Sequence, residues 1–178
     1  MHGGGITSPL APLDIAISPD SGCGQFNPGL DDNGSIIRAV TAYLAALPAP
    51  LPESSMSKAA EPYQLGQRLF SSAGCASCHT PMLSSSRGDV ALYSDLLLHD
   101  MGPSLNDGII QGDATGAEWR TTPLWGLRLR ARFLHDGRAA TPAEAILTHD
   151  GDGAEAARAF RRLTHDDRKA LLTFISML

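Results

Sequence analysis

Hydrophobic residues recur at helical spacing in several short segments of this chain. The segment SIIRAVTAYLAAL (35–47) repeats apolar residues every three or four positions, which predicts a helix. A second helix is expected from Pro62, a residue suited to a first helical turn, towards Gly74. Residues 80–135 lack this period and are expected to be mostly loop, with one short helix at VALYSDLLL (90–98).

Two capping signals predict the starts of further helices. In TPAE (141–144), a threonine is followed three residues later by glutamate, with proline at the first helical position. THDD (164–167) has the same arrangement with aspartate, and it precedes an apolar face made of Leu171, Leu172, Phe174, Ile175 and Leu178. No segment shows convincing strand alternation, so the predicted fold class is all-α with long loops.

Prolines indicate how the chain is divided. The segment PAPLPESS (48–55) cannot continue a helix and is typical of an extended linker. A boundary is therefore expected near residue 52. Residues 1–52 would form an irregular segment, rich in Gly, Pro, Asp and Asn, that carries one helix. Residues 53–178 would form the main domain.

The charge balance excludes some classes of partner. A net charge of −5 argues against general nucleic-acid binding, and no apolar run approaches the ~20 residues that a membrane helix needs. The N-terminal stretch MHGGGITSPLAPLDIAIS has no cationic start and is interrupted by prolines, so it does not resemble a signal peptide. A local group of arginines is either a solvated face or a set of partners for a bound anion; it comprises Arg120, Arg128, Arg130, Arg132 and Arg138.

The stretch Cys75-Ala-Ser-Cys78-His79 is the candidate chemical centre. A structural zinc site normally needs four ligands, and only Cys23 remains, for which a free structural thiol is the simplest interpretation. A redox dithiol would follow a strand, whereas this pair follows a predicted helix. Covalent haem explains all three residues: the thiols add to its vinyl groups, and His79 becomes the proximal iron ligand. We expect the loop of Pro81 to direct a carbonyl at the other nitrogen of that imidazole.

Four segments carry a resemblance to a known family. They are GQRLFSSAGCASCHTP, YSDLLLHDMGPSL, GAEWRTTPLWGLRLRARFLHDGRAATPAEAIL and LTHDDRKALLTFISML. From about residue 60 onward, the chain resembles the C-terminal haem domain of bacterial di-haem cytochrome c peroxidases, and most closely the di-haem oxidoreductase (thiol-oxidoreductase-like) branch. The resemblance implies a cytochrome c-like domain with one covalent haem c. Residues 35–52 look like the tail of a preceding haem domain.

The resemblance also implies where the sixth iron ligand lies. In the family this ligand comes from the helix after the motif F-x-H-D-G, and the matching residue here is His149. A His79/His149 iron is therefore expected. Met101, in LLLHDMGP, is the rival ligand, because its thioether in a Gly-Pro loop could also reach the iron.

Further roles follow for residues around the haem. His135 matches the histidine of F-x-H-D-G and is expected to form hydrogen bonds near the haem or its propionates, with Asp136 holding its tautomer. Arg120 and Arg138 are candidates for pairing the propionates, because a guanidinium fits a carboxylate bidentately. Trp119 and Trp125 flank the same loop. They are packing residues, or one of them relays electrons between two haems.

Family peroxidases hold calcium partly through a Thr-x-Pro segment before F-x-H-D-G. Here Arg130 and Arg132 stand at the matching positions, and two cationic side chains argue against calcium.

The chain carries one C-x-x-C-H motif where the family carries two, and this shapes the functional expectation. With two protein ligands, the iron has no vacant site for peroxide. The first hypothesis is electron transfer, as the C-terminal half of a di-haem peroxidase-like oxidoreductase whose partners are a second haem domain and a small redox donor protein. The alternative is a self-sufficient mono-haem peroxidase or oxygen-reactive enzyme, in which the sixth ligand dissociates. Haem attachment implies the periplasm, so we interpret the sequence as the C-terminal part of a longer exported protein.

Overall fold

The computed structural model describes residues 8–9, 30–48, 61–86 and 88–178. Contacts within the chain divide it into two units. One comprises Met1–Ala49 with Asp107–Gly116, and the other comprises Pro50–Asn106 with Ala117–Leu178. The predicted boundary near residue 52 and the predicted free thiol of Cys23 lie outside the described residues.

The first unit contains the helix α1 (Ser35–Ala46), which confirms the helix predicted over 35–47. The Asp32 carboxylate accepts hydrogen bonds from the backbone N–H groups of Ile36 and Ile37, each at 3.2 Å. These bonds satisfy donors that the first helical turn would otherwise leave unpaired.

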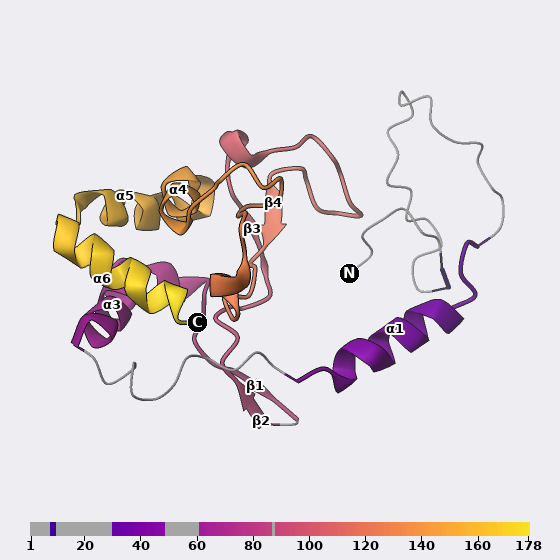
Figure 1. The fold of residues 1–178 in the computed structure, drawn as a ribbon. Helices are drawn as coiled ribbons and strands as arrows, with labels where there is room; N and C mark the ends of the chain where they lie inside the picture. The colour runs from indigo at the N-terminus through magenta and orange to yellow at the C-terminus, as the bar shows by residue number, and fades with distance from the viewer. Residues whose placement is uncertain (1–7, 10–29, 49–60, 87) are drawn as a thin grey trace. The chain divides into compact units, whose positions relative to one another are not determined.

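Among its described residues, the second unit contains four α-helices (Figure 1): α3 (Glu61–Ser72), α4 (Pro142–Thr148), α5 (Ala154–Arg162) and α6 (His165–Ser176). Both capping signals are confirmed. The hydroxyl oxygen of Thr141 accepts from the N–H of Glu144 at 3.1 Å, and that of Thr164 accepts from the N–H of Asp167 at 3.2 Å. The sequence reasoning did not predict α5. In the described part of the chain, no helix has the length and apolar character needed to cross a membrane.

The core of this unit lies where α3 packs against α6. Gly66 brings the two backbones close: a β-carbon at Gly66 would lie 2.2 Å from the carbonyl oxygen of Ala170. Aromatic rings then interlock edge to face, with ring centroids 5.1 Å apart for Tyr63 and Phe174 and 5.3 Å apart for Phe70 and Phe174. The buried cluster comprises Tyr63, Phe70, Leu127, Phe160, Leu171, Phe174, Ile175 and Leu178.

The prediction of an all-α fold is wrong, because the described residues also form two antiparallel two-stranded sheets. In one, β1 (Leu83–Ser85) pairs with β2 (Gly88–Val90). In the other, β3 (Leu98–Asp100) pairs with β4 (Glu118–Arg120), which places His99 opposite Trp119. Each strand has three residues, which is too short for alternation to be read from the sequence.

The short helix predicted over 90–98 is also wrong. Tyr93 and Leu96 have positive φ angles of 53° and 61°, which an α-helix does not allow. The segment is instead held against the cysteine loop, because the N–H of Ser94 donates to the carbonyl of Thr80 at 3.0 Å and the N–H of Asp95 donates to that of Cys78 at 2.9 Å. These long-range hydrogen bonds outweigh the local helical pattern.

Candidate functional site

The cysteine motif forms a tight turn directly after α3. Gly74 adopts a left-handed conformation (φ 88°), a 3-10 turn covers Cys75–Ser77, and the N–H of His79 donates to the carbonyl of Cys75 at 2.9 Å. Cys75 and Cys78 are free thiols. Cys75 packs against the core cluster, and burial raises the pKa of its thiol to about 11. Cys78 instead lines a hollow beside the loop.

His79 is held as a neutral imidazole with one fixed ring nitrogen. Its Nδ1 lies 3.0 Å from the carbonyl oxygen of Tyr93 and donates to it. The expectation that the loop of Pro81 would supply this carbonyl is wrong, because the acceptor lies 14 residues away along the chain. Burial, and to a smaller extent the nearby His149, lower the pKa of His79 to about 4. Nε2 therefore keeps its lone pair, which is the state that a metal requires.

His149 ends α4 and lines the same hollow. Its Nδ1 donates to the carbonyl of Ala145 at 2.7 Å, and burial lowers its pKa. Two close backbone approaches fix this region against the Met101 loop: a β-carbon at Gly151 would lie 2.1 Å from the carbonyl oxygen of Asp100, and one at Gly153 would lie 3.1 Å from His149 and 3.2 Å from the Met101 methyl. The two predicted sixth ligands, His149 and Met101, therefore lie side by side on one wall of the hollow.

The hollow has a volume of about 390 Å³, which is within the ~300–1,000 Å³ typical of cofactor sites. Four histidines and Cys78 line it, together with apolar side chains such as Leu105, Leu124, Leu127 and Phe133. In the part of the chain that is described, this hollow brings together the thiol of Cys78, the predicted proximal ligand His79 and both candidate sixth ligands.

The arginines of the hollow differ in part from those predicted. Arg120 lines it as expected, and so do Arg130 and Arg132. Arg138 is not among the lining residues: its guanidinium pairs with the Asp136 carboxylate and donates to the carbonyl of Ser104 at 2.8 Å. The arginines that line the hollow are therefore Arg120, Arg130 and Arg132.

Trp119 and His135 form a stacked pair on the wall of the hollow. Their ring centroids are 3.7 Å apart at an interplanar angle of 9°, and the indole N–H of Trp119 donates to the carbonyl of Leu105 at 2.9 Å. Asp136, expected to hold the tautomer of His135, forms its hydrogen bonds with Arg138. Trp125 is half-buried and is not among the residues that line the hollow.

Sequence reasoning missed a polar group next to Cys78. His99 Nδ1 lies 3.8 Å from Cys78 Sγ, and His99 Nε2 lies 2.9 Å from a carboxylate oxygen of Asp95. One ligand atom from each of these three residues lies within 4.8 Å of the other two. The sequence contains a signal for this pair, because His99 follows Asp95 by four residues, but that spacing indicates proximity only in a helix.

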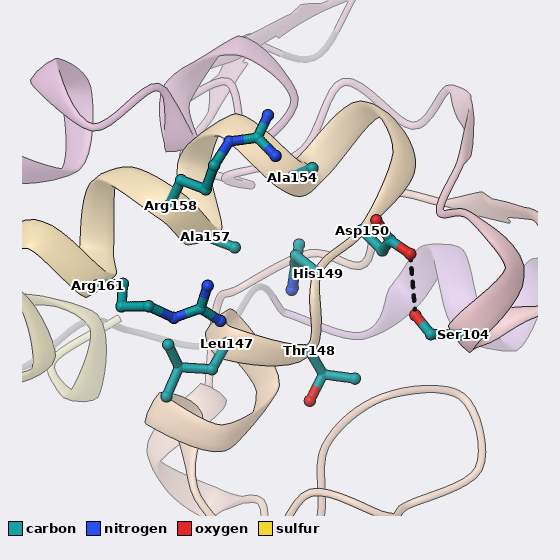
Figure 2. Close-up of a pocket in the computed structure, with 9 residues that line it drawn as sticks. All are labelled: Ser104, Leu147, Thr148, His149, Asp150, Ala154, Ala157, Arg158 and Arg161. Atoms are coloured by element: carbon teal, nitrogen blue, oxygen red, sulfur yellow. Dashed lines mark hydrogen bonds between the residues drawn. The ribbon is translucent and has the colours of Figure 1, made fainter.

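A second hollow of about 350 Å³ is also lined by His149 (Figure 2). Arg158 and Arg161 reach into it from α5, and the hydroxyl of Ser104 donates to the carboxylate of Asp150 at 3.3 Å across its edge. His149 therefore lines both hollows.

The donor set fits a covalently held haem. Two free thiols stand at the C-x-x-C spacing along the chain, and two neutral imidazoles with fixed Nδ1 donors line one largely apolar hollow. Arginines also line the hollow, and propionates would need such cationic partners.

Comparisons with known proteins agree with this chemistry. A family model described as "Di-haem oxidoreductase, putative peroxidase" matches residues 38–178. Among solved structures, the chain is similar to hydrazine synthase of Kuenenia stuttgartiensis pressurized with 20 bar xenon, at 20% identity and a TM-score of 0.57. The similarity covers 80% of this chain and 55% of that chain, so it concerns the fold alone and about half of the larger molecule. A comparison with curated proteins found no match.

Proposed function

Because this chain belongs to the di-haem oxidoreductase family, we propose that it binds one haem c covalently through Cys75 and Cys78 and transfers electrons. It would act as the C-terminal, electron-transferring half of a peroxidase-like oxidoreductase. One observation carries the proposal: the neutral imidazoles of His79 and His149 face the same hollow beside the thiol of Cys78.

The side chains have separable tasks in this proposal. The carbonyls of Tyr93 and Ala145 accept the Nδ1–H groups of His79 and His149, which leaves each Nε2 as the ligand atom. A haem bound here would supply one-electron redox chemistry. Apolar side chains exclude water from the hollow, so that little rearrangement accompanies a change of charge.

Electron transfer is favoured over peroxide chemistry because His79 and His149 would together leave a bound iron no vacant position for peroxide. The alternative of a self-sufficient mono-haem peroxidase or oxygen-reactive enzyme has one observation in its favour. The second hollow leaves room beside His149, into which the imidazole could turn and so open the iron (Figure 2).

The proposal extends to partners and compartment. The family is di-haem, whereas this chain has one C-x-x-C-H motif, so a second haem domain would receive or supply the electrons. A small redox protein would be the donor. Covalent attachment of haem c takes place after export, so the periplasm is the expected compartment.

The test is an absorption spectrum of the full chain, produced in the periplasm with the haem-maturation machinery. We expect covalent haem, a low-spin spectrum and no binding of carbon monoxide in the ferrous state. His149→Ala should open the iron to carbon monoxide, whereas His165→Ala, a change at an exposed histidine, should not. If Met101→Leu opens the iron and His149→Ala does not, the ligand assignment is wrong. An absence of covalent haem together with bound zinc in metal analysis would refute the proposal.

A further inference from the structure

The two cysteines of the motif lie in different environments. Cys75 packs against the apolar core cluster. Cys78 Sγ lies between two polar groups: the hydroxyl of Ser77, which donates to it at 3.9 Å, and His99 Nδ1, at 3.8 Å. These distances suit hydrogen bonds of sulfur, which is a weak donor and acceptor. The side chain of Cys78 therefore has a preferred direction. Among the described residues, no corresponding pair of polar groups orients Cys75.

Asp95 fixes the orientation of the His99 ring. Its carboxylate accepts the Nε2–H of His99 at 2.9 Å and the backbone N–H of Leu97 at 3.0 Å. Partial burial raises the pKa of Asp95, but hydrogen bonds from Leu97, His99 and Thr121 outweigh this effect and lower it, so the carboxylate is ionised. The backbone N–H of Asp95 also donates to the carbonyl of Cys78 at 2.9 Å, which ties the acceptor to the cysteine loop.

This arrangement fixes which edge of the ring faces the thiol. With Nε2 held by the Asp95 carboxylate, Nδ1 lies 3.8 Å from Cys78 Sγ and 3.7 Å from a carboxylate oxygen of Asp152. Cys78 Sγ, which lines the hollow, therefore has Nδ1 as a fixed polar neighbour. The pairing of β3 with β4 also fixes the backbone at His99, because it places His99 opposite Trp119.

We propose that the Asp95–His99 pair positions Cys78 for attachment to haem, so that one thioether depends on this pair and the other does not. The inference rests on the proposed function, because it requires a haem c. In the attachment step, the S–H bond and the π bond of the vinyl group break. A bond forms between Sγ and one vinyl carbon, and the hydrogen ends on the other vinyl carbon, with no net oxidation. His99 acts through Cys78 and touches none of the vinyl atoms, so it is a positioning residue.

Replacing His99 should affect the two thioethers unequally. Without the imidazole of His99, Sγ of Cys78 is free to adopt other rotamers. A fraction of chains should then carry haem through Cys75 alone. Cys75 keeps its place, because apolar packing rather than hydrogen bonding holds it. A general structural defect would instead reduce both attachments together.

The experiment uses the full chain, produced in the periplasm with the maturation machinery. Purified haem-bearing protein is denatured, alkylated with iodoacetamide and analysed by peptide mass spectrometry. The α band of the pyridine haemochrome reports in parallel how many vinyl groups remain. Cys78→Ala provides the reference for a single thioether, and His165→Leu is the matched control at an exposed histidine.

In the native chain, only a small fraction of either cysteine of the motif should be alkylated. His99→Leu should raise the alkylated fraction of Cys78 about fivefold, in line with the loss of one hydrogen bond, while Cys75 stays linked. His99→Asn should restore attachment, because its side-chain oxygen can occupy the position of Nδ1.

Three results would overturn the inference. If His99→Leu attaches haem through both cysteines to the native extent, the inference fails while the proposed function stands. The same holds if His99→Leu loses both thioethers in equal measure, since that indicates a general structural role. If the native chain carries no covalent haem, the proposed function fails and the inference fails with it.

Discussion

Replacing Gly66 with alanine should destabilise this protein, although alanine is the better helix former. Gly66 lies in the middle of α3 at its contact with α6. A β-carbon there would lie 2.2 Å from the carbonyl oxygen of Ala170 and 2.6 Å from the β-carbon of Phe174. The nearest atom belongs to backbone, so it cannot turn away. The helices must separate by roughly 1 Å to reach ordinary contact, and that separation would weaken much of the dispersion attraction across the interface.

The expected change in the free energy of unfolding follows from two opposing effects. Alanine in place of glycine stabilises a helix interior by about 1 kcal/mol. Overpacking a core typically costs about 1–3 kcal/mol, and this site lies at the upper end because the edge-to-face contacts of Phe70 and Phe174 are strained together. We therefore expect a net loss of about 2 kcal/mol in the free energy of unfolding. With an m-value of ~1–3 kcal/mol per molar urea, the unfolding midpoint should fall by about 1 M.

The assay is urea unfolding of the haem-bearing chain, followed by circular dichroism and by haem absorbance. Gln67→Ala is the matched control, because it places alanine at the next, exposed position of the same helix. It should change the stability by no more than about 0.5 kcal/mol. If Gly66→Ala is as stable as the native chain, or more stable, then α3 and α6 do not approach as closely as described here, and the reasoning is refuted.

Other perturbations give equally specific expectations. Gly153→Ala should strain His149, whose atoms would lie 3.1 Å from the new β-carbon, and produce a partly high-spin ferric spectrum; an unchanged spectrum would contradict this. In the haem-free chain, burial holds the pKa of His79 at about 4, so the unfolded state takes up its proton first as the pH falls. Urea midpoints should show stability lost between about pH 6.5 and 4, by up to about 3 kcal/mol, and a flat profile would refute it. Arg130→Ala should lower the reduction potential more than Arg138→Ala, because only the former guanidinium lines the hollow; equal potentials in a redox titration would count against this assignment.

Much of the helical framework could be predicted because its signals are local. The threonines at 141 and 164 begin α4 and α6 through hydrogen bonds to residues three positions away. The helix α5 was missed because its buried face consists only of Ala157 and Phe160, too few apolar residues for a clear period. The strands were missed because three residues cannot display alternation. The helix predicted over 90–98 was wrong because Tyr93 and Leu96 adopt positive φ angles, and hydrogen bonds to the cysteine loop hold the residues between them.

In the candidate site, too, local features could be predicted from the sequence, and long-range contacts could not. The sequence alone determined that two thiols and a histidine stand together, because Cys75, Cys78 and His79 lie within five residues and one turn holds them. Only the tertiary structure decided that the carbonyl of Tyr93 orients His79 and that Asp95 and His99 accompany Cys78. These contacts join segments separated by long loops, and no local rule of spacing specifies them. Backbone approaches that only glycine permits, at the helix crossing and beside the predicted sixth ligand, bring the segments together.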